Sequence, residues 1–449
     1  MRVRFAPSPT GFLHLGGLRT ALFNYLQARK TNGTFIVRIE DTDQSRSVPG
    51  AVEKLLQDLN TFGLDFDEGP GKPNGTDYFQ SNRLSVYRKY ADHLLSKGLA
   101  YYCQCPKDQF CNCRLRPVNA EQPKTIRFSP QNIDSVEFED ENYGKIVNKE
   151  PVNNVVLIKS DGFPTYHFAN VIDDHEMRVD LVMRGQEWLP STPLHLKLYK
   201  AFDWSPPRFC HLPLLLNPDR TKLSKRDSAS NVEWYLEQGF LPAAVLNFTS
   251  FLGWTPSVNF EGNREILSIE ELVSVFSFKD LNRADAVVDI ERLKWFNKQH
   301  MLIADSKDLM TILLKKMPGV DEQYAISVLE AMKGRISTID ELYENCDYFF
   351  KDPELSLDGQ SFDHESLEYI AKFKSELDAL ECITEDHLTC LLGRLKSTDR
   401  QASRRNMLAL RFAITGKLVG TSMSKTISLL GKCACLNRLA RFELLLKKN

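Results

Sequence analysis

The first third of the chain alternates short apolar runs with segments in which apolar residues recur every three or four positions. An apolar opening at Val3 and Phe5 precedes a helical pattern over residues 18–26, and the strand-like run 34–39 precedes helical patterns over 51–59 and 84–98. Strand patterns return at residues 155–158 and 181–184. This alternation predicts a parallel sheet whose ligand site lies beyond the carboxyl ends of its strands.

Two stretches depart from this alternation. Between about residues 101 and 156 the pattern breaks into loops, short strands and cysteines, which indicates an insertion. Helical periodicity dominates later, and no proline follows Pro353, which favours a helical terminal domain. Helices are predicted over residues 270–276, 290–298, 307–315, 321–332, 365–380, 385–395, 404–415 and 424–430. Aromatic residues at helical spacing are predicted to lie in the core, namely Phe248, Phe251, Trp254 and Trp295.

Composition limits the class of protein. With 449 residues, 42% of them hydrophobic and 26% charged, the chain has room for two to four ordinary globular domains. No run of 18 apolar residues occurs, so we expect no membrane-spanning helix. The ten cysteines lack the arrangement of a secreted disulfide framework and favour a reducing compartment.

Charge is distributed unevenly along the chain. The net charge of −2 argues against a bulk polyanion binder, yet residues 394–449 contain only two acids, Asp399 and Glu443, among many bases. Such a terminal region predicts a nucleic-acid contact, with a solvated helical face as the alternative. Its basic residues are Arg394, Lys396, Arg400, Arg404, Arg405, Arg411, Lys417, Lys425, Lys432, Arg438, Arg441, Lys447 and Lys448.

Two motifs carry candidate chemistry. SPTGFLHLGG, residues 8–17, joins the first strand to the first helix, where glycines permit close approach of a nucleotide and free N–H groups attract phosphate. NPDRTKLSKR, residues 217–226, places Lys222 and Lys225 three positions apart, a charge pattern that suits a departing pyrophosphate. Taken separately, each motif is more often a plain turn or a solvated loop.

Together, the two motifs resemble the HIGH and KMSKS signatures of class I aminoacyl-tRNA synthetases. The segments RVRFAPSPTG (2–11), RIEDTD (38–43), DGFPTYHFAN (161–170) and RGQEW (184–188) resemble glutamyl-tRNA synthetases of the bacterial or organellar, mitochondrial-like type. The resemblance runs from Arg2 to about Trp295 and continues more weakly to the end. It implies a Rossmann-type α/β catalytic domain (1–85 and 160–216) with an α+β acceptor-binding insertion (86–159), a stem-contact region with the KLSKR loop (217–300) and an all-α anticodon-binding domain (301–449).

The implied activity is that of a glutamate–tRNA ligase. ATP, accompanied by Mg²⁺, would activate L-glutamate to glutamyl-adenylate, and the glutamyl group would pass to the 3′ end of tRNA(Glu). Whether tRNA(Gln) is also charged stays open. A glutaminyl-tRNA synthetase relative and a catalytically inactive tRNA-binding paralogue are the alternatives.

A pocket for glutamate needs cations for two carboxylates and an anion for the ammonium group. Arg4, Arg184 and Glu40 supply these charges near predicted strand ends, although Arg4 and Glu40 could instead pair with each other. The resemblance places the following residues in the glutamate site: Arg4, Ala6, Ser8, Glu40, Tyr166, Asn170 and Arg184.

The resemblance also assigns the nucleotide site. His14, Lys222 and Lys225 would be the catalytic residues, and Arg335 would contact the tRNA anticodon. The residues expected to bind ATP are His14, Gly16, Gly17, Glu187, Leu214, Leu215, Lys222 and Lys225.

Four cysteines in the predicted insertion are candidate zinc ligands. Cys103, Cys105, Cys111 and Cys113 lie within eleven residues, but their C-x-C pairs are tighter than the usual C-x₂-C spacing. Many bacterial family members hold zinc with a longer stretch between the two halves. Structural zinc and four reduced thiols both remain open.

The expected partners are tRNA(Glu), L-glutamate and ATP, with no membrane and no second copy of the chain. The first signature, GFLHLGGLR (11–19), is closer to animal mitochondrial members than to bacterial ones. This similarity predicts the mitochondrial matrix, with the cytoplasm as the alternative.

Overall fold

The chain divides into two compact units. In this computed structural model the first unit comprises Met1–Glu237 and Pro242–Leu293, and the second comprises Gln238–Leu241 and Lys294–Asn449. The described residues are 1–73, 75–105, 113, 124–129, 136–148, 154–223, 230–257, 264–316, 319–356 and 362–446.

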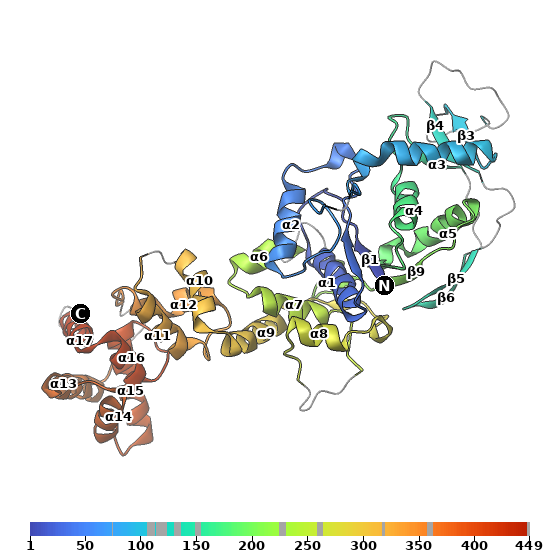
Figure 1. The fold of residues 1–449 in the computed structure, drawn as a ribbon. Helices are drawn as coiled ribbons and strands as arrows, with labels where there is room; N and C mark the ends of the chain where they lie inside the picture. The colour runs from blue at the N-terminus through green and yellow to red at the C-terminus, as the bar shows by residue number, and fades with distance from the viewer. Residues whose placement is uncertain are drawn as a thin grey trace. The chain divides into compact units, whose positions relative to one another are not determined.

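A six-stranded sheet forms the centre of the first unit, with strand order β2–β1–β8–β9–β5–β6. Figure 1 labels β1, β9, β5 and β6 of this sheet. The first five strands run parallel, and β6 runs antiparallel to β5, so the predicted parallel sheet is confirmed. The strands are β1 (Arg2–Phe5), β2 (Thr34–Val37), β5 (Val136–Asp140), β6 (Gly144–Asn148), β8 (Leu181–Gly185) and β9 (Arg208–Leu212).

Helices cover both faces of this sheet. Helix α1 (Leu15–Lys30) packs on β1, β2 and β8, and α7 (Pro242–Ser250) and α8 (Ile269–Val275) pack on α1. The opposite face presents Ile36, Val182 and Phe209 to a core shared with α3 (Leu84–Ser96), α4 (Tyr166–Glu176) and α5 (Thr192–Ala201). Because side chains alternate along a strand, the same face also receives the residues two positions further along each strand. Helices α2 (Ala51–Thr61) and α6 (Val232–Glu237) complete this unit.

Two smaller sheets accompany the large one. Strands β3 (Ala100–Cys103), β4 (Thr125–Phe128) and β7 (Val155–Ile158) form an antiparallel sheet, and β10 (Leu215–Leu216) pairs with β11 (Ala286–Val287). Residues 136–148 belong to the range predicted as the insertion, but β5 and β6 extend the large sheet beyond β9. Short 3₁₀ turns occur at Gln44–Arg46, Gln80–Arg83, Gln186–Ser191, Phe278–Asp280 and Asp347–Phe349.

The second unit is helical, as predicted, with a core formed by α13, α14, α15, α16 and α17. The prediction that Trp295 lies in a core is wrong, because its side chain is 44% exposed. The buried stripe of α9 runs through Leu293, Phe296 and Met301, and Trp295 lies off this stripe. The helices are α9 (Ile290–Ile303), α10 (Ser306–Lys316), α11 (Glu322–Met332), α12 (Ile339–Cys346), α13 (His364–Ala379), α14 (Glu385–Arg394), α15 (Arg400–Thr415), α16 (Met423–Leu430) and α17 (Lys432–Leu446).

In the part of the chain that the structure describes, no helix combines the length and the apolar character needed to cross a bilayer.

Candidate functional site

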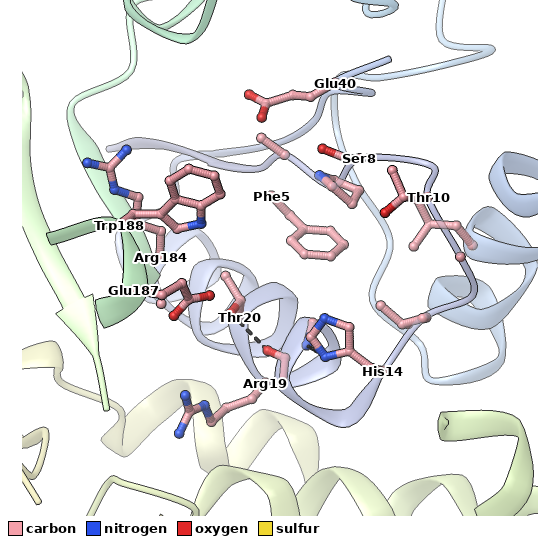
Figure 2. Close-up of a pocket in the computed structure, with 18 of the residues that line it drawn as sticks. Phe5, Ser8, Thr10, His14, Arg19, Thr20, Glu40, Arg184, Glu187 and Trp188 are labelled. Atoms are coloured by element: carbon pink, nitrogen blue, oxygen red, sulfur yellow. Dashed lines mark hydrogen bonds between the residues drawn. The ribbon is translucent and has the colours of Figure 1, made fainter. Parts of the chain in front are cut away.

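A cavity of about 420 Å³ lies where β1, β2, β8 and β9 end. The segments that follow these strands supply Ala6, Glu40, Glu187 and Leu214, respectively, to its lining. Figure 2 shows Arg184, Glu187 and Trp188 on one side of the cavity and His14 on the opposite side. Strands β2 and β8 flank β1, so the cavity opens at the point where strand order reverses, which is where parallel sheets bind ligands.

Most predicted site residues meet at this cavity. Asn170 does not line it but donates to Glu40 Oε1 at 2.9 Å, and Lys225 lies outside the described residues. The predicted residues that line the cavity are Arg4, Ala6, Ser8, His14, Gly16, Gly17, Glu40, Tyr166, Arg184, Glu187, Leu214, Leu215 and Lys222.

Helix α4 holds two charged residues of the cavity, Arg4 and Glu40. Arg4 donates to Asp174 through Nε at 3.1 Å, and the fully buried Arg38 donates to the same carboxylate at 2.8 Å. Arg38 also donates to Glu40 at 2.9 Å. Among the described residues, Glu40 therefore pairs with Arg38 and Asn170, and the alternative of a direct pair with Arg4 is not what the structure forms.

The pKa values of these two buried carboxyl groups are shifted in opposite directions. Burial raises the pKa of Glu40 above its ordinary value, although Arg38 and Arg4 favour the carboxylate. Burial also opposes ionisation of Asp174, but its two arginine neighbours outweigh burial and lower the pKa of Asp174. Packing around Tyr166 raises the pKa of its phenol to about 12, so the hydroxyl remains a hydrogen-bond donor.

His14 caps the N-terminus of α1. Its Nδ1 accepts from the Gly17 backbone N–H at 3.0 Å, which in the neutral ring leaves the proton on Nε2. A Cβ atom on Gly16 would lie 3.1 Å from the His14 ring. Glycine at this position therefore keeps the helix N-terminus open toward the cavity.

The Lys222 loop is anchored on both sides of residues 224–229, which lie outside the described residues. Before them, Leu223 N donates to Leu215 O at 3.0 Å; after them, Val232 N donates to Leu13 O at 3.1 Å. Lys222 itself is exposed and lines the cavity. These backbone bonds bring the second motif to the first one, about two hundred residues earlier in the sequence.

Trp188 and Arg19 are among the lining residues that sequence reasoning did not assign. The Trp188 ring lies 4.2 Å from the Tyr166 ring between centroids, and its place in the RGQEW segment was the signal that could have identified it. Arg19 is buried beneath the cavity, donates to the carbonyls of Leu252 and Pro213, and has its pKa lowered to about 10 by burial. Its position on an apolar helix gave no functional signal.

Three of the four candidate zinc ligands converge. The sulfurs of Cys103, Cys105 and Cys113 all lie within 4.8 Å of one another, and the Cys105 and Cys113 sulfurs are 3.3 Å apart. Cys111 lies outside the described residues. Three converging thiols are a chemically suitable set for zinc, with a fourth position left for another ligand.

The basic residues of the second unit are largely paired with acids of that unit. Arg335 is exposed and donates to the Gly420 carbonyl at 2.9 Å. Lys396, Arg400 and Arg404 are exposed and form no ion pair with the described residues, and Lys447 and Lys448 lie outside them. The ion pairs join Arg394 to Glu376, Arg405 to Asp363 and Glu365, Lys425 to Glu385, Lys432 to Asp378, and both Arg438 and Arg441 to Asp352.

Known tRNA synthetases resemble this chain over nearly its whole length. Residues 1–120 and 114–295 match the catalytic domain of class I tRNA synthetases (E and Q), and residues 293–442 match an anticodon binding domain. The glutamate–tRNA ligase of Dehalococcoides mccartyi is 37% identical, with 98% of this chain and 96% of that protein covered. The mitochondrial glutamate–tRNA ligase of Schizosaccharomyces pombe is 38% identical, covering 100% and 92%, respectively.

A solved structure supports the same relationship. The crystal structure of a glutamate tRNA ligase from Elizabethkingia meningosepticum, in complex with its amino acid, matches with a TM-score of 0.86 at 31% identity. The match covers 98% of each chain.

Proposed function

The chain belongs to the glutamate–tRNA ligase family of class I aminoacyl-tRNA synthetases, and from this premise we propose that its cavity binds L-glutamate beside ATP and forms glutamyl-adenylate. One observation carries the proposal: buried Arg4, Arg184 and Glu40 surround a cavity that also receives His14 and Lys222. The charges match a dicarboxylate with one ammonium group, and His14 and Lys222 suit a phosphate chain.

Glutamate is held by opposite charges and by small neighbours. Arg4 and Arg184 bind its carboxylates, and Tyr166 donates a hydrogen bond. Glu40, with Ala6 and Ser8 beside it, receives the ammonium group. Asn170 acts from behind the cavity through its hydrogen bond to Glu40.

ATP occupies the part of the cavity next to α1. Gly16 and Gly17 lie against the adenosine, and Glu187, Leu214 and Leu215 border the ribose and adenine. His14, Lys222 and Lys225 bind the triphosphate, with Mg²⁺ accompanying it.

The reaction needs alignment more than covalent catalysis. A carboxylate oxygen of glutamate attacks the α-phosphorus, the bond to the bridging oxygen breaks, and pyrophosphate leaves with the electron pair. The Nε2–H of His14 and the two lysine ammonium groups stabilise the charge that develops on pyrophosphate. A terminal ribose hydroxyl of tRNA then displaces AMP from the adenylate.

Pyrophosphate exchange tests this proposal. With purified tRNA(Glu) present, exchange between pyrophosphate and ATP should require glutamate, and Lys222→Ala or Lys225→Ala should lower its rate at least about tenfold, the loss of one charged interaction. Lys97→Ala, which breaks an exposed pair with Asp203, is the matched control and should leave the rate unchanged. Exchange supported by glutamine instead, or by neither amino acid, would contradict the proposal.

The tRNA partner is proposed to be tRNA(Glu), with recognition of the anticodon by the second unit. The anticodon-domain match at 293–442 and the exposed position of Arg335 support this proposal. Aminoacylation of separated tRNA(Glu) and tRNA(Gln) decides whether both are charged. Arg335→Ala should raise the KM for tRNA without changing the KM for glutamate.

We propose a structural zinc ion at Cys103, Cys105 and Cys113, with Cys111 as the fourth ligand. The distance of 3.3 Å between two of the sulfurs is near the edge of a ZnS₄ tetrahedron, about 3.8 Å for Zn–S bonds of about 2.3 Å. One equivalent of zinc in the purified protein, lost in Cys105→Ser, is expected. Metal-free protein with full aminoacylation activity would favour reduced thiols.

The remaining assignments concern organisation and location. We propose a monomer in which residues 1–85 and 160–216 form the catalytic domain, 86–159 the acceptor-binding insertion, 217–300 the stem-contact region and 301–449 the anticodon-binding domain. The similarity of 38% to a mitochondrial relative supports the mitochondrial matrix, whereas 37% to a bacterial one keeps the cytoplasm as the alternative. Light scattering and immunodetection in fractionated cells test the two assignments.

A further inference from the structure

Arg184 is a buried cation whose hydrogen-bond acceptors are all uncharged. Its Nε donates to His211 Nε2 at 3.1 Å, and its Nη2 donates to the Thr192 hydroxyl at 3.0 Å. Its Nη1 lies 3.3 Å from His195 Nδ1 and 3.5 Å from the Tyr166 hydroxyl. Among the described residues, no carboxylate forms an ion pair with this guanidinium.

Two other buried arginines of this region are neutralised in place by a carboxylate, whereas Arg19 donates to backbone carbonyls. Arg4 and Arg38 both donate to Asp174, and the side chains of all three residues are almost fully buried. A cation already paired in this way attracts a further anion less strongly. Arg184 thus differs from Arg4 and Arg38 in keeping its full charge for whatever enters the cavity.

The arginine fixes the tautomers of the histidines beside it. A guanidinium can only donate, so His211 Nε2 must present a lone pair and its proton must sit on Nδ1. That proton points at Asp140 Oδ2, which lies 2.6 Å from His211 Nδ1. By the same logic, His195 accepts at Nδ1 and donates from Nε2 to His167 Nδ1, 3.0 Å away.

Asp140 is in turn fixed by the backbone. Its Oδ1 accepts from the N–H groups of Asn142 at 3.1 Å, Tyr143 at 3.0 Å and His211 at 3.3 Å, which leaves Oδ2 for the His211 ring. Burial opposes its ionisation, but the hydrogen bond from His211 and those backbone bonds lower the pKa of Asp140. Burial lowers the pKa of His211, so its ring stays neutral.

Sheet register brings the three residues together. Arg184 on β8 lies directly opposite His211 on β9, and Asp140 lies on β5, the next strand. All three are buried, with exposed fractions of 4%, 0% and 1%, respectively. Asp140 does not line the cavity, so it can act on a ligand only through His211 and Arg184.

We propose that Asp140 and His211 are positioning residues that hold Arg184 as an unneutralised cation and thereby make the pocket select a carboxylate over a carboxamide. Neutral acceptors fix the guanidinium without cancelling its charge. A substrate carboxylate then supplies the missing counter-ion, whereas a carboxamide leaves the buried charge unpaired. This inference rests on the proposed binding of glutamate at Arg184.

Asp140→Asn is the decisive substitution. The three backbone N–H groups hold the amide oxygen where Oδ1 is now, so the amide nitrogen faces His211 and donates to its Nδ1. His211 must then carry its proton on Nε2, directed at Arg184 Nε–H. Two donors facing each other turn the guanidinium away from its position. An amide in place of the carboxylate of a Ser–His–Asp triad likewise imposes the wrong histidine tautomer.

The expected kinetic result separates binding from chemistry. The KM for glutamate in pyrophosphate exchange should rise by about tenfold, the loss of one hydrogen bond to a charged group, with a smaller change in kcat. The ratio of kcat/KM for glutamate to that for glutamine should fall by a similar factor. The matched control is Asp203→Asn, which removes an exposed charge paired with Lys97 and should change neither quantity.

A double substitution tests the route of the effect. In His211→Gln, the side-chain amide oxygen can accept from Arg184 without a proton on the Asp140 side. Adding Asp140→Asn to this variant should therefore raise the KM for glutamate less than twofold further, a strongly non-additive result. Equal effects of Asp140→Asn in both backgrounds would overturn the proposal, because they indicate a general structural role.

The protonation state of His211 can be measured in the wild-type protein, so this test does not depend on the activity of a variant. In full-length protein labelled with ¹⁵N-histidine, the His211 ring should show a proton on Nδ1 and a bare Nε2, assigned by its absence in His211→Gln. A proton on Nε2 would overturn the positioning mechanism even if exchange is glutamate-dependent. Absence of glutamate-dependent exchange in the wild type would instead contradict the proposed function, so the two failures are distinguishable.

Discussion

At the scale of single residues, Arg38 shows how buried charge supports the site. Arg38 is fully buried and donates to Asp174 at 2.8 Å and to Glu40 at 2.9 Å, and its Nε lies 3.8 Å from Asp173. Burial alone would lower the pKa of this guanidinium, but the three carboxylates raise it above its ordinary value. Its main contribution is to keep two acids that flank the cavity charged and in place.

Arg38→Met should therefore destabilise the first unit. Removing the cation leaves buried carboxylates without their partner, which costs roughly 3–5 kcal/mol and lowers the unfolding midpoint by about 6 °C or more. Arg88→Met, which removes an exposed pair with Asp92, is the control and should change stability by less than about 1 kcal/mol. Equal melting midpoints for the two variants, measured by calorimetry, would refute this account.

The buried histidines predict a pH dependence. Burial lowers the pKa of His167 to about 4, whereas in the unfolded chain it titrates near 6.5. Between these values the unfolded state binds more protons, so stability is present above about pH 6.5 and is lost as the pH falls toward 4. In His167→Asn, whose amide oxygen can still accept from His195, this loss should be smaller by up to roughly 1.4 kcal/mol per pH unit. Denaturation midpoints from pH 7 to 4.5 measure the difference, and identical slopes for the two proteins would exclude His167 as the cause.

At the scale of elements, the glycines at the N-terminus of α1 lower the stability of the helix but leave space at the cavity. Two glycines occupy its first turn, where alanine would favour the helix by about 1 kcal/mol each. A Cβ on Gly17 would lie 2.9 Å from Leu13 Cδ1, and one on Gly16 would lie 3.1 Å from the His14 ring. Both glycines line the cavity, so the space they leave faces the proposed nucleotide site.

Gly16→Ala should accordingly impair ATP binding without unfolding the protein. The added methyl group displaces the His14 ring, and the KM for ATP in pyrophosphate exchange should rise at least about tenfold, equivalent to about 1.4 kcal/mol. Gly393→Ala in α14 is the control, since its Cβ would meet no atom within 4 Å. That variant should gain up to about 1 kcal/mol in stability with an unchanged KM for ATP. An unchanged KM in Gly16→Ala would show that the helix N-terminus does not contact the nucleotide.

At the scale of the whole molecule, the chain contains two units with separate cores. One core gathers Ile36, Phe168 and Val182 of the first unit, and the other gathers Phe373, Leu410 and Leu439 of the second. The proposed glutamate and ATP site belongs entirely to the first unit. Binding of glutamate or ATP should therefore directly stabilise only the first unit.

Calorimetry of the full chain should show two unfolding transitions. A non-hydrolysable glutamyl-adenylate analogue at about one hundred times its Kd should stabilise one transition by about 2.7 kcal/mol and leave the other unchanged. Arg38→Met identifies the responsive transition, because it should lower the same midpoint that the analogue raises. A single transition that moves as a whole would show that the two cores unfold together.

The sequence patterns predicted part of the fold and some of the residues at the cavity. Alternation of strand and helix patterns predicted β1, β2, β8 and the helices α1, α2 and α3. The two motifs predicted that His14 and Lys222 lie at one site, and both line the cavity. The short strands β5, β6 and β9 were not predicted, since each has few residues and a pattern that is not uniquely strand-like. The excess of basic residues in the sequence at 394–449 suggested a more basic surface than the second unit has. Acidic residues distant in sequence form ion pairs with many of these bases.

The chain's own periodicity and motifs therefore determined the class of fold, the family and thirteen of the residues that line the cavity. Only the tertiary structure decided which charges are neutralised: Asp174 pairs with Arg4 and Arg38, whereas Arg184 meets His211 and no acid among the described residues. The physical reason is that periodicity records which side of an element is buried, but not which side chain lies across from it. That second fact depends on strand order and register, which join segments far apart in sequence.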